Sequence, residues 1–423
     1  MDRAGEANSI YDELGVPPVI NATGTKTRIG GSRIRTGAID AMNRASESFV
    51  RLSDLQAEAS ARIAEITGAQ AGYVTSGAAA GLLLGAAAAL AGHDIQRMDR
   101  LPETAGIPDE IVMPRTHRTG YDHAFRATGA TIVDVGTNDR HLGTGSTNVE
   151  PWEIEAAITA ETAAIGYIEK PYTGPPLGVV TEIAHEHDIP VIVDAAAELP
   201  PTTNFSRFID DGADLVVFSG GKAIRGPQTT GIVAGRKDLI QSMALQHLDM
   251  HAASEVWEPP ERLIDLEEID GVPRQGIGRP MKVGKEELVG LIVALESFLE
   301  EDQAETNRGW HERAVRISEE LSKIEGIKTT VTVGNDVSVA PETIVRIDPD
   351  EAGISASELV RALRSENPRV FVGADRLDEN VVTINPMCLE DGEPGYVLDR
   401  IWAHAGPESD EPVSERDVAN TTG

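Results

Sequence analysis

The 423-residue chain has little cysteine, little lysine and no long apolar run. Its one cysteine, Cys388, excludes an intrachain disulfide and is typical of a reducing cytoplasm. The longest apolar stretch, GLLLGAAAALAG after residue 80, is too short and too rich in alanine to span a bilayer. The first residues, MDRAGEANSIYDELG, show no apolar run after a basic region, so we expect no signal peptide. The sequence thus predicts a soluble cytoplasmic protein without a membrane partner.

The scarcity of lysine accompanies a large excess of acidic residues. Only eight of the 37 basic residues are lysine, and 69 acidic residues give a formal net charge of −32. This balance is typical of halophilic proteins, because salt screens the repulsion between surface carboxylates. Nucleic-acid binding requires clustered lysine and arginine, so no nucleic-acid partner is expected.

The order of strand-like and helical segments indicates the fold class. Short apolar runs alternate with helical patterns: AGYVTSG, EIVMP, ATIVDVG, AAIGYIE, PVIVDAA and ADLVVFSGG. That alternation predicts an α/β domain with a parallel sheet covered by helices on both faces. One long helix over residues 285–324 and the short strands that end near INPMCL predict a second, α+β domain.

These patterns divide the chain into four regions. We expect an N-terminal segment (1–45) that packs with the small domain, a large domain (46–290), a small C-terminal domain (291–405) and an acidic, disordered tail (406–423). In open parallel sheets, ligands bind at the carboxyl ends of the strands. The residues that directly follow each apolar run are therefore the functional candidates.

Two of the strand ends carry an anion-binding pattern and a carboxylate. After YVT, the small residues Ser76, Gly77 and Ala78 lead into a helix whose first N–H groups favour an anion. An ordinary helix cap is the alternative interpretation. Asp194 ends the run VIVD, where it either holds a buried cation or caps the following turn.

A third strand end carries a lysine. Lys222 follows Ser219 and two glycines, which allow a flat ligand to approach the backbone closely. Apolar surroundings lower the pKa of a lysine and make it a nucleophile, whereas a solvated loop lysine is the alternative. The phosphate loop, the aspartate and the lysine occur in the order that pyridoxal 5′-phosphate requires.

In these stretches the chain resembles the fold-type-I pyridoxal-phosphate enzymes, and more narrowly the seryl-tRNA(Sec) selenium transferase-like group, which includes D-glucosaminate-6-phosphate ammonia lyase. The resemblance covers roughly residues 15–300 in the stretches VINATGTKTRIGGSRI, GYVTSGAAAGL, PRTHRTGYDHAFRATGA, VIVDAAAELPP, FSGGKAIRGPQTTG and GRPMKVGKEELVGLIVAL. It implies a mainly parallel seven-stranded sheet with a smaller α+β C-terminal domain. It also implies a homodimer, or a multiple of dimers, in which the loop RQGIGRPMKVGKE completes the neighbour's phosphate site.

The resemblance also implies a role for each matching residue. Lys222 would hold the cofactor covalently, Asp194 would face the pyridine nitrogen, and His117 would stack on the ring. For the stacking role, Arg115 is nearly as well placed, and a surface-loop histidine is the alternative interpretation. The residues that would hold the phosphate are Ser76, Gly77, Ala78 and Ser219.

Two departures from the selenium transferases bear on the substrate. The tRNA-binding domain of those enzymes has no counterpart here, and INPMCL stands where they carry an arginine-containing strand. We therefore expect a small-molecule substrate rather than tRNA, and no metal. Its anionic groups are expected to meet one or more of four basic residues, unless these are surface residues only: Arg33, Arg279, Lys282 and Arg376.

The resemblance favours a carbon–nitrogen lyase. Elimination from a small 3-hydroxy-2-amino acid or amino-sugar acid, with or without a phosphate, would give a 2-oxo acid and ammonia. The same residues would serve a racemase, an aldolase or a selenium-transferase-like transferase. A non-catalytic protein that binds pyridoxal phosphate is the remaining alternative.

Overall fold

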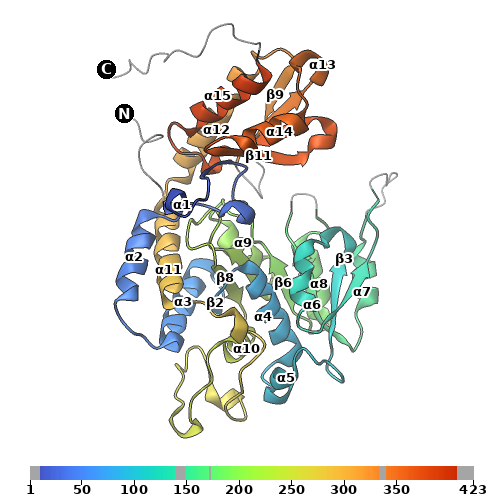
Figure 1. Cartoon of the computed structure of the whole chain (residues 1–423). Coiled ribbons are helices and arrows are strands. Elements are labelled where there is room, and N and C mark those ends of the chain that lie inside the picture. The colour runs from blue at the N-terminus through green and yellow to red at the C-terminus, as the bar shows by residue number, and fades with distance from the viewer. Residues whose placement is uncertain (1–9, 140–147, 171–172, 333–339, 407–423) are drawn as a thin grey trace. The chain divides into compact units, whose positions relative to one another are not determined.

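The computed structural model describes residues 10–139, 148–170, 173–332 and 340–406. These residues form two compact units, drawn in Figure 1. The larger unit contains residues 25–303, and the smaller unit contains residues 10–24, 304–332 and 340–406. The tail expected to be disordered lies, beyond Gly406, outside the described residues. No helix among the described residues is long and apolar enough to cross a membrane.

The larger unit is built on a seven-stranded sheet. The strand order is β2 (Ala71–Thr75), β8 (Gly231–Gly235), β7 (Leu215–Ser219), β6 (Val191–Asp194), β5 (Thr162–Ile168), β3 (Glu110–Pro114) and β4 (Thr131–Val135). Strand β8 runs antiparallel to both of its neighbours, and the other pairs are parallel. This confirms the predicted fold-type-I architecture with a mainly parallel sheet.

Helices cover both faces of this sheet, which explains why its inner strands are apolar and buried, whereas the edge strand β4 is partly exposed. Ile192, Leu215 and Val217 belong to one hydrophobic core, whereas Val191 and Val216 belong to a second one. Helices α4 (Ala78–Ala91), α5 (Ile95–Arg100), α6 (His123–Arg126) and α10 (Lys237–His247) contribute to the first core. The second core includes α2 (Thr36–Ser46), α3 (Leu52–Thr67), α7 (Pro151–Ala157), α8 (Leu177–Glu186), α9 (Asn204–Asp210) and α11 (Lys285–Glu300).

Helix α4 packs closely on the sheet through glycines. A Cβ atom on Gly81 would lie 2.9 Å from both Val217 Cγ1 and Val233 Cγ2. A Cβ atom on Gly85 would lie 3.1 Å from Leu215 Cδ1. The small residues that the sequence shows in this helix are therefore required by its contact with the strands.

The helix expected over residues 285–324 is in fact two helices. Helix α11 ends at Glu300, Glu301 takes an extended backbone (φ −67°, ψ 139°), and α12 spans Gln303–Leu321. Helix α11 stays with the larger unit because it packs along α2, where Gly290 lies against Met42. The unit boundaries therefore differ from the predicted ones, since residues 25–45 and 291–303 belong to the larger unit.

The smaller unit is an α+β structure, as the sequence predicts. Its sheet has the order β1 (Val19–Ala22), β11 (Arg369–Arg376), β12 (Val381–Ile384), β10 (Thr343–Ile347) and β9 (Ile327–Val331). Only β1 and β11 are parallel among these pairs. The helices are α1 (Ile10–Glu13), α12, α13 (Pro349–Ala352), α14 (Ala356–Ser365) and α15 (Glu393–Ala405).

Candidate active site

The strand ends that carry the predicted site residues meet at one edge of the larger sheet. Thr75 and Ser219 both pair with Gly231, so the ends of β2 and β7 flank the start of β8. Asp194 pairs with Val217 of β7 and with Ile168 at the end of β5. Figure 1 shows this sheet with α4 packed against it. The structure thus brings the expected anion-binding residues and Asp194 to adjacent strand ends.

The start of α4 has no side-chain cap, as an anion-binding helix end requires. Gly77 precedes the helix with φ +103°, and it has no side chain with which to cap the first turn. The Thr75 hydroxyl donates to the Gly77 carbonyl at 2.9 Å, which fixes the turn. The backbone of Gly231 lies directly behind, since a Cβ there would be 2.7 Å from Ala78 N. The first N–H groups of a fourteen-residue helix therefore face outward from the sheet edge.

Asp194 is a buried carboxylate between cationic groups. Its Oδ1 accepts a hydrogen bond from the Ala196 N–H at 3.0 Å, so it does cap the following turn. Burial raises the pKa of Asp194, whereas that N–H and the charges of Lys170 and Lys222 lower it. The carboxylate therefore combines the structural role with a place beside the lysine that the sequence singles out.

Lys222 lies on a closed, half-buried loop rather than in solvent. Gly226 N–H donates to the Gly220 carbonyl at 2.9 Å. Glycine is required at position 221, because a Cβ there would lie 2.4 Å from Gln228 Cα. Burial lowers the pKa of Lys222, and the charge of Asp194 opposes that effect. These surroundings suit an amine nucleophile.

His117 is fully buried at the end of β3, so it is not a surface-loop histidine. Its Nδ1 accepts a hydrogen bond from the Ile168 N–H at 3.2 Å, which places the proton of the neutral ring on Nε2. Burial lowers the pKa of His117 to about 4, and the Gly174 carbonyl opposes that shift. Among the described residues, no contact of Nε2 has the geometry of a full hydrogen bond. Arg115, by contrast, is exposed and lies 3.6 Å from Asp134.

Comparisons with known proteins agree with this arrangement. The family model for L-seryl-tRNA selenium transferase (SelA) matches residues 19–252. A 5′-C-glycyluridine monooxygenase-decarboxylase from a Streptomyces species is 31% identical over 93% of this chain and 92% of its own length. The chain belongs to the SelA family.

Two further comparisons concern an ammonia lyase of the same group. D-glucosaminate-6-phosphate ammonia lyase of Salmonella typhimurium is 29% identical over 93% of this chain and 97% of its own length. A solved structure of a D-glucosaminate-6-phosphate ammonia-lyase matches with a TM-score of 0.75 at 28% identity, over 95% of this chain and 100% of the other. These likenesses confirm a SelA-like enzyme of fold type I.

The residues of this SelA-family chain fit pyridoxal phosphate at each end of the cofactor. The uncapped start of α4 suits the phosphate, and the buried carboxylate of Asp194 suits a protonated ring nitrogen. The buried Nε2 of His117 makes no full hydrogen bond among the described residues. The half-buried Lys222 supplies the amine.

The four expected substrate residues lie on different parts of the chain. Arg33 lies on the segment that packs on the Lys222 loop, where the Ser32 hydroxyl donates to the Gly221 carbonyl at 3.0 Å and Arg225 Nε donates to the Arg33 carbonyl at 3.0 Å. Arg376 lies in the smaller unit at the end of β11, in an ion pair of 2.6 Å with Glu379.

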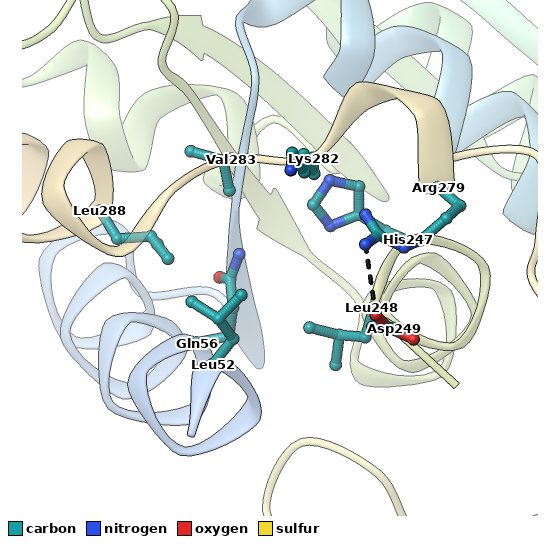
Figure 2. Close-up of a pocket in the computed structure, with 9 residues that line it drawn as sticks. All are labelled: Leu52, Gln56, His247, Leu248, Asp249, Arg279, Lys282, Val283 and Leu288. Carbon is teal, nitrogen blue, oxygen red and sulfur yellow. Dashed lines mark hydrogen bonds and ion pairs between the residues drawn. The ribbon is translucent and has the colours of Figure 1, made fainter. Parts of the chain in front are cut away.

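Arg279 and Lys282 line a pocket beside β2, shown in Figure 2. Arg279 Nη2 lies 3.3 Å from Asp249 Oδ2, and His247 Nε2 hydrogen-bonds the Met281 carbonyl at 2.9 Å. The other residues that line it are Leu52, Gln56, Leu248, Val283 and Leu288. Asp194 and Lys222 do not line this pocket. Which of the four basic residues meets the substrate stays a prediction.

Sequence reasoning missed three residues at the site. Lys170 Nζ lies 2.7 Å from Glu198 Oε1, and both side chains interact electrostatically with Asp194 and Lys222. Lys170 comes two residues after β5, so the strand-end rule applied to AAIGYI would have found it. Gly231 was missed because the sequence GIVAG does not indicate that the backbone of Gly77 and Ala78 packs against it.

Proposed function

We propose that the protein is a pyridoxal-phosphate-dependent ammonia lyase acting on a small 3-hydroxy-2-amino acid or amino-sugar acid. The observation that carries the proposal is the meeting of Lys222, Asp194 and the uncapped start of α4 at one sheet edge. The likeness to D-glucosaminate-6-phosphate ammonia lyase over nearly the whole chain supports elimination as the reaction.

In this proposal each residue has a defined task. The first N–H groups of α4, with Ser76 and Ser219, bind the phosphate, and Asp194 keeps the ring nitrogen protonated. His117 packs against the ring, and Lys222 holds the cofactor covalently. The bound cofactor supplies an electron sink for the substrate's α-carbon.

Lys222 then moves the proton that starts the reaction. Its Nζ accepts the proton from the substrate's α-carbon, as a general base whose lowered pKa favours the amine form. The hydroxyl group on the β-carbon leaves with a proton as water. Water then adds at the α-carbon, and ammonia leaves, which gives one 2-oxo acid for each ammonia.

The cofactor assignment is tested by chemical trapping. The purified protein should be yellow, and borohydride should fix the cofactor irreversibly on the peptide that contains Lys222. The Lys222→Ala variant should bind no reducible cofactor, whereas Lys323→Ala, an exposed lysine paired with Glu320, should behave as the unchanged protein. Trapping on another lysine would refute the assignment.

The reaction is tested with a panel of 3-hydroxylated 2-amino acids and amino-sugar acids, each with and without a phosphate. Ammonia and 2-oxo acid should appear in equal amounts. Exchange or inversion of the α-hydrogen alone would indicate a racemase, and release of an aldehyde would indicate an aldolase. Cofactor without any turnover would indicate a binding protein.

A second candidate is oxidative decarboxylation. The 31% identity to a 5′-C-glycyluridine monooxygenase-decarboxylase, over 92% of that protein, favours it. Such a reaction would consume molecular oxygen and release carbon dioxide. An oxygen electrode run with the same panel, and with glycyl-nucleosides added, separates the two candidates, because the lyase reaction proceeds unchanged without oxygen.

A further inference from the structure

Three of the eight lysines of this acidic chain interact at one place. Lys26 and Lys170 both act electrostatically on Lys222, together with the carboxylates of Asp194 and Glu198. The loop of Lys26 is tied to that of Lys222, because Gly31 N–H donates to the Lys26 carbonyl at 3.0 Å and Gly31 lies directly against the Gly221 carbonyl. In a chain of net charge −32, such a group of lysines needs a physical explanation.

The backbone fixes where Lys170 lies. Ile168 pairs with Asp194, and the Glu169 N–H donates to the Asp194 carbonyl at 3.0 Å, so Lys170 emerges immediately beyond the end of β6. Its ammonium nitrogen lies 2.7 Å from Glu198 Oε1. The Lys170 side chain keeps 31% of its surface exposed, whereas that of Glu198 keeps only 3%.

Glu198 is itself held rigidly. Its N–H donates to the Ala195 carbonyl at 3.1 Å, and Asn204 Nδ2 donates to the Glu198 carbonyl at 2.6 Å. The buried carboxylate lies on the turn that follows Asp194. Its ion pair with Lys170 therefore holds the ammonium group of Lys170 in a fixed position near Asp194. An exposed ion pair would not be oriented in this way.

We propose that Lys170 is a positioning residue of the site: Glu198 fixes its ammonium group beside Lys222, where the positive charge favours the unprotonated amine of Lys222. This inference rests on the proposed role of Lys222. Asp194 gives this charge its purpose, because the carboxylate raises the pKa of Lys222 and Lys170 opposes that effect, together with burial. The same electrostatic logic activates other amine nucleophiles that lie next to a second cation.

The charges that face the two lysines agree in sign with this role. Burial, Lys170 and Lys26 lower the pKa of Lys222, while Asp194 and Glu198 raise it. The charges of Glu198, Asp194 and Glu169 surround Lys170, and Glu169 is itself within 3.5 Å of Arg207. Three carboxylates therefore offset the positive charge of Lys170.

The test measures the protonation of Lys222 in the protein stripped of cofactor. Trace labelling of amines with acetic anhydride, followed by mass spectrometry of the Lys222 peptide, gives the labelling midpoint as a function of pH. In Lys170→Gln, which keeps a donor to Glu198 but loses the charge, the midpoint should rise by about one pH unit. At a fixed pH below the midpoint, labelling should then fall about tenfold.

Two further variants make the result specific. Lys170→Arg keeps the positive charge and should restore the midpoint of the unchanged protein. Lys323→Gln removes an exposed lysine that is paired with Glu320, with 58% of its side chain exposed, and should change nothing. If Lys170→Gln fails to fold, Lys170→Gln/Glu198→Gln, which leaves no charge buried alone, is compared with Glu198→Gln. The double variant should have the higher Lys222 midpoint, by about one pH unit, because only Lys170 differs between the two.

An unchanged Lys222 midpoint in the folded Lys170→Gln protein would overturn the inference. So would equal midpoints in Lys170→Gln/Glu198→Gln and Glu198→Gln. Either result would leave the proposed function intact, provided that borohydride still traps the cofactor on Lys222. Trapping on a different lysine would instead refute the proposed function, whatever the labelling shows. The two failures are therefore distinguishable.

Discussion

Replacing Gly231 by alanine should damage the anion-binding end of the site without removing any side chain from it. The added Cβ would lie 2.5 Å from Gly77 C and 2.7 Å from Ala78 N, both of which are backbone atoms. Carbon atoms pack favourably at about 3.5–4.0 Å, so the turn before α4 must retreat by about 1 Å. Overpacking of this kind costs about 1–3 kcal/mol.

Because the strain is released by moving the start of α4, most of the loss should appear in cofactor binding. A loss of about 1–3 kcal/mol corresponds to a dissociation constant roughly 5- to 150-fold higher. The assay is titration of the stripped protein with pyridoxal phosphate, followed by its visible absorbance, beside urea unfolding of the same protein. Gly37→Ala is the matched control, because the new Cβ would meet only Val293 at 3.9 Å. Cofactor affinity in Gly231→Ala equal to that of the control would refute the reasoning.

Three other predictions address stability and assembly. The net charge of −32 should make the melting temperature several degrees higher in molar salt than in dilute buffer, and equal values would contradict salt adaptation. Phe49 is 102% exposed, and we expect a homodimer to cover it. Phe49→Ser should then weaken the dimer by roughly 3–6 kcal/mol, measured by light scattering. Trp152→Ser is the control and should leave the dimer unchanged. The pKa of His117 is about 4 in the folded protein and 6.5 in the unfolded chain, so stability should fall between pH 6.5 and 4 as the unfolded state takes up the proton. Urea unfolding should show the free energy of unfolding falling by about 3 kcal/mol over this range. The His117→Asn variant should not show this fall.

The sequence predicts the larger sheet well because its strands are buried on both faces. Such strands read as continuous apolar runs, and the residue that follows each run marks the ligand-binding edge. That rule predicts Ser76, Asp194 and Ser219, and the structure places all three at or directly after strand ends of this sheet. His117 was predicted from the family resemblance alone, and it lies in the turn after β3. Their roles toward the cofactor stay predictions.

Local patterns predict helix ends and long-range partners less well. The helical pattern continues through Glu301 and Asp302, so the break between α11 and α12 has no signal in the sequence. In the sequence, Arg279 and Lys282 are indistinguishable from Arg33, because charge alone does not indicate which part of the fold a loop packs against. The pairing of Lys170 with Glu198 spans 28 residues and depends on the adjacency of β5 and β6.

The glycines of α4 link the hydrophobic core to the choice of ligand. Gly81 and Gly85 set how far the helix stands from the sheet. The proposed phosphate-binding N–H groups belong to the helix, whereas Asp194 ends β6 and Lys222 lies on the loop after β7. The separation between those two layers must match the length of one rigid molecule. A methyl group added in the core would therefore change the distance between the helix start and Asp194, although every ligand-contacting residue would keep its identity. Substitutions that change the volume of this core are then limited by the dimensions of the proposed cofactor, and not by folding stability alone.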